Sequence, residues 1–217
     1  MKFFCTFLSF ILVNLVNAQF AIIDDKDGYC NVRVNPEKGD NIIDKLENGC
    51  IVLCGEVNGN WVSVFYLKDN DEPAGYVYNN RLKMITTTYE ALPILSKSDG
   101  AYMFGKDSIK VKITKQKFDQ GKTKLANDKI YWGNDGGIPG FAYRSITITR
   151  GNKIIDLPKT AFEDLFEPGF HNTKVNYDGA NDILYIQAMN GDGAGGYGVM
   201  WRIVKGKYKD RFVMHGF

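Results

Sequence analysis

The chain has 217 residues, of which 44% are hydrophobic and 13% aromatic, with 23 glycines against 6 prolines. This composition excludes a disordered chain, a collagen and a coiled coil, and the length suits one large domain or two small ones. The formal net charge of +2 indicates no attraction for nucleic acid, and only 2 histidines and 4 cysteines are available for catalysis or metal binding.

Residues 1–18 have the pattern of a secretory signal peptide. Lys2 precedes an apolar stretch that runs from Phe3 to Val16, and the small residue Ala18 closes it. The stretch is too short and too interrupted for a membrane helix. We therefore expect cleavage before Gln19 and a secreted or periplasmic protein without a membrane anchor.

Residues 20–84 consist of short Val-, Ile- and Tyr-rich runs separated by turn residues. The runs are NVRVNP, NIIDKL, CIVLCGEV, NWVSVFYL and AGYVYNN, with turns such as Asn35-Pro36 and Asn48-Gly49 between them. Short runs of this kind at regular spacing predict the strands of a small barrel or sandwich.

Four pieces of this segment resemble the bacterial SH3-type domain. NVRVNP at 31–36 is similar to the family's NVRxGP strand and turn, and Ile43 with Leu46 matches its vIGxL pair. NWVSV at 60–64 and GYVYNNRL at 75–82 are similar to gWxxV and GYVxxxyL. The resemblance covers about 65 residues, and it departs from the family at Asn60, at Val34 and in the longer acidic loop before Gly75.

The resemblance implies a binding module for cell-wall peptide or an envelope protein, without catalytic activity. Aromatic side chains beside acidic ones suit a peptide that carries cationic groups. We expect the ligand to contact Trp61, Tyr66, Asp71 and Tyr76.

Three cysteines follow the signal segment: Cys30, Cys50 and Cys54. In an oxidising compartment one disulfide between neighbouring strands is expected, in which Cys30 pairs with Cys50 or with Cys54. Cys50 and Cys54 would lie about 13 Å apart on one strand, too far to bond to each other. The spacing does not match a zinc site.

The first domain is expected at 19–88, a linker at 89–104 and a β-rich C-terminal domain at 105–217. Hairpins are signalled at Gly151-Asn152, Asp178-Gly179 and Lys205-Gly206. The run PKTAFEDLFEP at 158–168 predicts one short helix. The fold class is therefore all-β with one short helix, an SH3-like barrel followed by a β-rich domain.

The run NGDGAGGYGVMW at 190–201 contains GxGxxG by count, but the period-two pattern after it predicts a strand instead of a nucleotide-binding helix. Calcium is an alternative, with oxygen ligands from Asn190 and Asp192, although no EF-hand frame is present. A third interpretation is a finger that enters the cleft of a toxin or hydrolase. Its residues would be Asn190, Gly191, Asp192, Gly193 and Tyr197.

The sequence contains only weak matches to known catalytic motifs. His171 and His215 lie 44 positions apart without a zinc-protease frame, and no GxSxG motif or P-loop occurs. Glu163 and Glu167 are a candidate acid pair for a cell-wall hydrolase, but acids at the start of a helix more often interact with its dipole.

We therefore expect a non-enzymatic binding protein with no cofactor and no metal. Its partner is expected to be cell-wall peptide or an envelope protein. Two alternatives remain open: an inhibitor or immunity protein against a toxin or wall-degrading enzyme, and a carboxylate-dependent hydrolase.

Overall fold

The computed structural model describes residues 19–69, 71–121, 131–191 and 193–216. The predicted signal segment 1–18 lies outside these ranges. The described chain is mainly β, arranged in three antiparallel sheets with one short α-helix, α1 (Ile85–Thr88). The predicted all-β class is confirmed.

The first sheet contains the seven strands of residues 19–84, in the order β3-β2-β6-β5-β4-β1-β7. Its strands are β1 (Gln19–Ile23), β2 (Tyr29–Arg33), β3 (Ile42–Glu47), β4 (Ile51–Asn58), β5 (Trp61–Phe65), β6 (Ala74–Tyr78) and β7 (Leu82–Met84), and the 3-10 turn η1 (Asn79–Arg81) joins the last two. Alternating residues such as Val32, Val62 and Val77 fill the core on its inner face. The resemblance of this unit to the bacterial SH3-type domain rests on its sequence.

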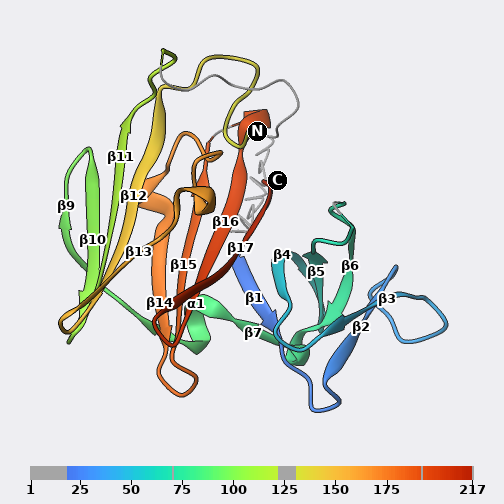
Figure 1. Cartoon of the computed structure of the whole chain (residues 1–217). Coiled ribbons are helices and arrows are strands. Elements are labelled where there is room, and N and C mark those ends of the chain that lie inside the picture. Colours follow the sequence, from blue (N-terminus) through green and yellow to red (C-terminus); the bar gives the residue numbers. More distant parts are fainter. Residues whose placement is uncertain (1–18, 70, 122–130, 192, 217) are drawn as a thin grey trace, which may run out of the picture.

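Two five-stranded sheets form the second unit (Figure 1). One has the order β13-β12-β11-β10-β9, with β9 (Ile94–Lys97), β10 (Ala101–Lys106), β11 (Ile109–Lys117), β12 (Phe141–Arg150) and β13 (Lys153–Asp156). The other has the order β17-β16-β15-β14-β8, with β8 (Glu90–Ala91), β14 (Thr173–Asp178), β15 (Ile183–Asn190), β16 (Tyr197–Val204) and β17 (Lys207–His215). The main core lies between them, around Trp201 and Ile186. Short 3-10 turns occur at η2 (Lys159–Ala161), η3 (Phe170–Asn172) and η4 (Gly193–Gly195).

Two hairpin turns occur where the sequence predicts them. Residues Arg150 and Lys153 pair across Gly151-Asn152, and Val204 and Lys207 pair across Lys205-Gly206. Gly151, Lys205 and Gly206 have φ values of 55°, 50° and 69°, as a tight hairpin turn between twisted strands requires. The third hairpin closes through a longer loop between Asp178 and Ile183.

A separate apolar cluster joins the two units. Phe20 and Ile22 point from one face of β1 towards Met200 and Phe212 of the β14–β17 sheet. Ala21 and Ile23, on the other face of β1, belong to the core of the first unit. Strand β1 is thus buried on both faces, and each large apolar side chain buried this way contributes about 1.5–3 kcal/mol.

Three expectations are corrected. Residues 89–104 do not form a linker, because β8, β9 and the start of β10 lie within them and pair in both sheets of the second unit.

The segment 158–168 does not form the predicted helix and contains only the 3-10 turn η2. The carbonyl oxygen of Ala161 instead accepts from Trp201 Nε1 at 2.8 Å and from Arg211 Nη1 at 3.1 Å.

The third correction concerns the cysteines. Cys30, Cys50 and Cys54 are all free thiols. Cys30 is opposite Leu46 in register, and Cys54 is opposite Gln19 and Val64, so neither has a cysteine as its cross-strand partner.

Candidate functional site

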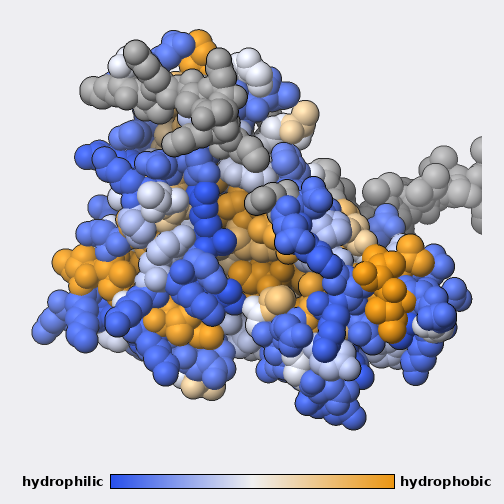
Figure 2. All heavy atoms as spheres, turned by 45° about the vertical axis from the view of Figure 1, so that its right-hand side comes forward, coloured by the Kyte–Doolittle hydropathy of each residue, from blue (hydrophilic) through white to orange (hydrophobic). Residues whose placement is uncertain are grey.

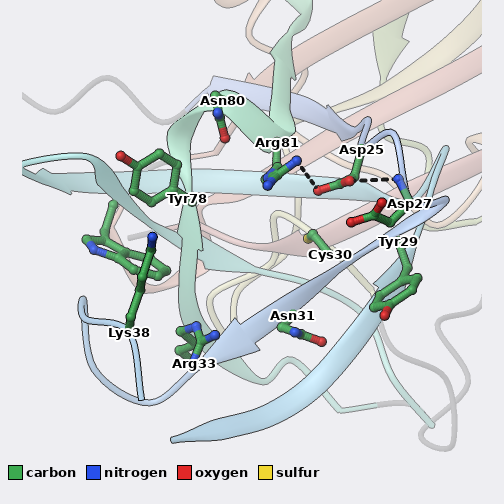
Figure 3. Close-up of a pocket in the computed structure, with 11 residues that line it drawn as sticks. Asp25, Asp27, Tyr29, Cys30, Asn31, Arg33, Lys38, Tyr78, Asn80 and Arg81 are labelled. Atoms are coloured by element: carbon green, nitrogen blue, oxygen red, sulfur yellow. Dashed lines mark hydrogen bonds and ion pairs between the residues drawn. The ribbon is translucent and has the colours of Figure 1, made fainter. Parts of the chain in front are cut away.

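The clearest cavity of the first unit opens where strands β2 and β6 separate. The two strands pair only at Arg33 and Tyr76. Beyond this point a pocket of about 470 Å³ extends toward η1 (Figure 3). The residues that line it are Asp25, Asp27, Tyr29, Cys30, Asn31, Arg33, Lys38, Trp61, Tyr78, Asn80 and Arg81.

Two aromatic side chains form one wall of this pocket. Trp61 on β5 and Tyr78 on β6 are opposite in register and point outward, because Val62 and Val77 beside them fill the core. Their rings meet edge to face, with centroids 5.2 Å apart and planes at 86°. This favourable geometry holds the Trp61 ring in one orientation toward the pocket.

Two cationic side chains, those of Arg33 and Lys38, line the same end of the pocket as Trp61. Arg33 Nη1 donates to the carbonyl oxygen of Gly39 and to Asn41 Oδ1, both at 2.7 Å, so the guanidinium is held in place by uncharged groups. Its central carbon lies 5.8 Å from the centroid of the Trp61 ring. Among the described residues no acidic side chain forms an ion pair with Arg33 or Lys38. Both cations at this end of the pocket are therefore free of a direct carboxylate contact among the described residues.

The other end contains carboxylates (Figure 3). Asp25 is buried, pairs with Arg81 Nη1 at 2.7 Å, and accepts from the backbone N–H of Asp27 at 2.8 Å. The Asp25–Arg81 pair is neutral as a unit, whereas the Asp27 carboxylate forms no ion pair with a described residue. Opposite charges thus remain at opposite ends of one cavity.

Cys30 lies at the floor of the pocket. Its burial, with smaller effects of Asp25 and Cys50, raises the pKa of the thiol to about 12. A thiol with this pKa is protonated at neutral pH and is a poor nucleophile. The pocket around Cys30 is therefore better suited to holding a ligand than to attack by this thiol.

The predicted ligand residues do not form one site. Trp61 lines the pocket, and Tyr76 is half-buried on the same outer face, next to Arg33. Tyr66 is buried, and its hydroxyl donates to Asp44 Oδ2 at 2.9 Å, so its predicted ligand role is wrong. Asp71 lies in a turn bridged to Lys68, outside the lining of the pocket.

Sequence reasoning missed the charged residues of the site. The alternation in NVRVNP places Arg33 on the outer face of β2, since Val32 points inward, and this signal was available. By contrast, the Asp25–Arg81 pair joins residues 56 positions apart, and no local pattern indicates it.

The predicted finger is packed into the second unit. Asn190 is buried, and its Oδ1 accepts from the Gly169 N–H at 2.7 Å and the Tyr143 hydroxyl at 3.2 Å. Tyr197 is 1% exposed and its hydroxyl donates to the Phe166 carbonyl oxygen at 2.8 Å.

The rest of this loop is also held by backbone contacts. Gly191 N–H donates to the Glu167 carbonyl oxygen at 3.2 Å, and the carbonyl oxygen of Gly193 accepts from Gly196 at 3.1 Å. The predicted partner role of Asn190 and Tyr197 is therefore wrong, because their polar groups point into the fold. Asp192 lies outside the described residues.

The two acids of the candidate catalytic pair, Glu163 and Glu167, lie in different surroundings. Glu163 is exposed, whereas Glu167 Oε1 accepts from the backbone N–H groups of Gly140 and Phe141 and so orders that loop. Among residues 19–216, apart from the undescribed gaps, no three His, Cys, Asp or Glu side chains gather closely enough to hold a metal ion. No helix in the same ranges has the length and apolarity needed to cross a membrane.

Comparison of the chain with protein-family models, with curated proteins and with solved structures found no match.

Proposed function

We propose that the chain is a secreted or periplasmic, non-enzymatic binding protein whose first unit holds a cell-wall peptide in the pocket between β2 and β6. The observation that carries this proposal is the Arg33 guanidinium, fixed over Trp61 without a carboxylate partner among the described residues. A guanidinium held in this way can donate charge-assisted hydrogen bonds to a ligand carboxylate.

The two ends of the pocket suit a ligand with both charges. A carboxylate fits beside Arg33 and Lys38, an ammonium group fits beside Asp27, and the aliphatic part of a residue fits against Trp61. Cell-wall stem peptides carry free carboxylates and amino groups within a few bonds of each other. An envelope protein that presents the same groups would use the same contacts.

Co-sedimentation with purified peptidoglycan tests this proposal. The chain from Gln19 onward, which contains every described element, should pellet with the polymer. Lys38→Glu changes an exposed side chain and should weaken binding at least tenfold, because a charge-assisted contact is replaced by a repulsion. Arg33→Gln should weaken it to a similar degree.

Lys209→Gln, on the exposed side of β17 in the second unit, is the matched control and should bind as the unmodified chain does. Equal pelleting of Lys38→Glu and the control would overturn the proposal. So would the absence of any pelleting by the unmodified chain.

A further inference from the structure

Charge is divided unequally between the two halves of the chain. Residues 19–88 contain 7 basic and 11 acidic side chains, whereas residues 89–217 contain 19 basic and 14 acidic ones. The net charges of about −4 and +5 nearly cancel, so the whole-chain value hides a basic second unit. A basic unit attracts anionic partners whatever the total charge of the chain is.

Part of this charge lies on the outer face of the β9–β13 sheet. Val111, Ile113, Ile146 and Ile148 of this sheet point inward to the main core, so the residues between them point to solvent. Lys110 and Lys112 are exposed on the central strand of this face. No acidic side chain among the described residues forms an ion pair with either.

The strand register shows what surrounds the two lysines. One row across the sheet reads Gly105, Lys110, Thr149, Ile154, and the next reads Met103, Lys112, Thr147, Asp156. The one acidic group in these rows, Asp156, accepts a hydrogen bond from the Thr147 hydroxyl at 2.6 Å.

Large aliphatic side chains flank the lysines at both edges of this face. Ile154 on β13 is 70% exposed, and Leu95 on β9 is 51% exposed. Leu95 extends over Gly105, where an added Cβ atom would lie 2.7 Å from Leu95 Cδ1. Leu95 therefore rests on the sheet beside Lys110. Figure 2 shows one face of the molecule, on which hydrophobic side chains gather in separate patches within a hydrophilic surface.

We propose that this face, defined by Leu95, Lys110, Lys112 and Ile154, docks on an anionic lipid bilayer. The lysines match the negative charge of the headgroups, and the exposed aliphatic side chains can enter the boundary between headgroups and acyl chains. A dissolved polyanion would use the lysines alone. The face lies on the opposite side of the molecule from the first unit, so a docked protein holds the first unit away from the membrane (Figure 1).

Sedimentation with lipid vesicles tests this inference. The chain from Gln19 onward should bind vesicles with 30% phosphatidylglycerol in phosphatidylcholine, and it should not bind pure phosphatidylcholine. Each lysine near an anionic surface contributes about fivefold in affinity, so Lys110→Gln combined with Lys112→Gln should weaken binding by about 30-fold. Leu95→Gln combined with Ile154→Gln should also weaken it, by about tenfold or more.

Two controls make the outcome specific. Lys207→Gln combined with Lys209→Gln removes the same charge at the same spacing from β17, and Val57→Gln removes an exposed aliphatic side chain from the first unit. Both should bind as the unmodified chain does. The inference fails if the Lys110/Lys112 variant binds no worse than the Lys207/Lys209 control. It also fails if the Leu95/Ile154 variant retains full binding, since that result indicates a polyanion site.

The vesicle experiment is independent of the pocket. The Lys38→Glu variant should bind vesicles normally, and the Lys110/Lys112 variant should bind peptidoglycan normally. Loss of one binding activity therefore leaves the other proposal standing.

Discussion

Arg202 on β16 donates from Nη1 to the carbonyl oxygen of Gly49, in the first unit, at 2.8 Å. Its Nε and Nη2 atoms hold both carboxylate oxygens of Asp210 on β17, at 2.8 and 2.6 Å. One side chain thus couples the turn between β3 and β4 to the sheet of the second unit. The two units are thus joined by a polar contact, that of Arg202, and by the apolar cluster around Phe20 and Phe212.

Replacing Arg202 should therefore destabilise the whole molecule. In Arg202→Gln the Asp210 carboxylate and the Gly49 carbonyl lose their partner, and we expect a loss of about 2–3 kcal/mol in the free energy of unfolding. Urea unfolding followed by fluorescence and by circular dichroism measures it. Arg144→Gln, an exposed change on β12, should stay within about 0.5 kcal/mol. An equal stability of the two variants would show that this contact does not hold the units together.

Gly75 on β6 allows the close approach of β2 beside the pocket. A Cβ atom there would lie 2.4 Å from Val32 Cγ1 and 2.9 Å from the carbonyl oxygen of Arg33. We expect Gly75→Ala to lower stability by about 1–3 kcal/mol, because a buried side chain and a backbone carbonyl would have to shift to admit the methyl group. Gly100→Ala adds the same methyl group in open space and is the control for the thermal unfolding measurement. A Gly75→Ala protein as stable as this control would contradict the packing described.

The cysteines should differ in reactivity. Burial raises the pKa of both the Cys30 and the Cys54 thiol to about 12, while Cys50 is half-buried. A thiol-specific reagent at pH 8 should modify Cys50 first, and Cys30 and Cys54 only after unfolding. Mass spectrometry of the modified peptides identifies the order. Rapid modification of all three thiols in the folded protein would be incompatible with their burial.

Asp44 should make stability depend on pH in the acid range. A hydrogen bond from Lys68 is the main cause that lowers the pKa of the Asp44 carboxyl below its usual 3.8, assisted by bonds from the Lys45 N–H and the Tyr66 hydroxyl. Because the folded-state pKa is the lower one, this contribution is present above about pH 4 and is lost as pH falls through the folded value.

The Asp44→Asn variant should accordingly be less stable than the unmodified chain at pH 6. The difference should shrink as the pH falls below about 4. Chemical denaturation at a series of pH values measures both curves. Asp40→Asn, at an exposed site, is the control. A difference that stayed constant below about pH 4 would rule out the lowered pKa.

Local patterns were sufficient for most strands of this chain and for two of its predicted hairpin turns. The turns at Gly151-Asn152 and Lys205-Gly206 combine residues suited to positive φ with flanking β-branched runs, and both are hairpins. The misassigned helix shows the limit of such patterns. Phe162 and Leu165 have a spacing that fits a helix, but they fill the main core from an irregular segment whose Ala161 carbonyl is bonded by Trp201 and Arg211.

Long-range contacts account for most of what the sequence did not predict. Glu90 and Ala91 lie in a segment whose local sequence indicates a linker. In the structure they pair with Tyr177 and Asn176 on β14, more than 80 positions later. Strand β1 is buried on both faces only because the second unit covers Phe20 and Ile22. Trp61 was predictable as a candidate from its motif, and the outward position of Arg33 from the alternation in β2. The Asp25–Arg81 pair was not predictable, because it joins residues 56 positions apart.

The most direct test of the central claim is a calorimetric titration of the chain from Gln19 onward with a cell-wall stem peptide, in its free-acid form and with its carboxylates amidated. The account predicts that the unmodified chain binds the free acid at least tenfold more tightly than the amidated peptide. It further predicts that Arg33→Gln loses most of this preference, while Lys209→Gln keeps it. Equal affinity of the unmodified chain for the two peptides would contradict the role of Arg33, and no binding of either would contradict the pocket as a peptide site.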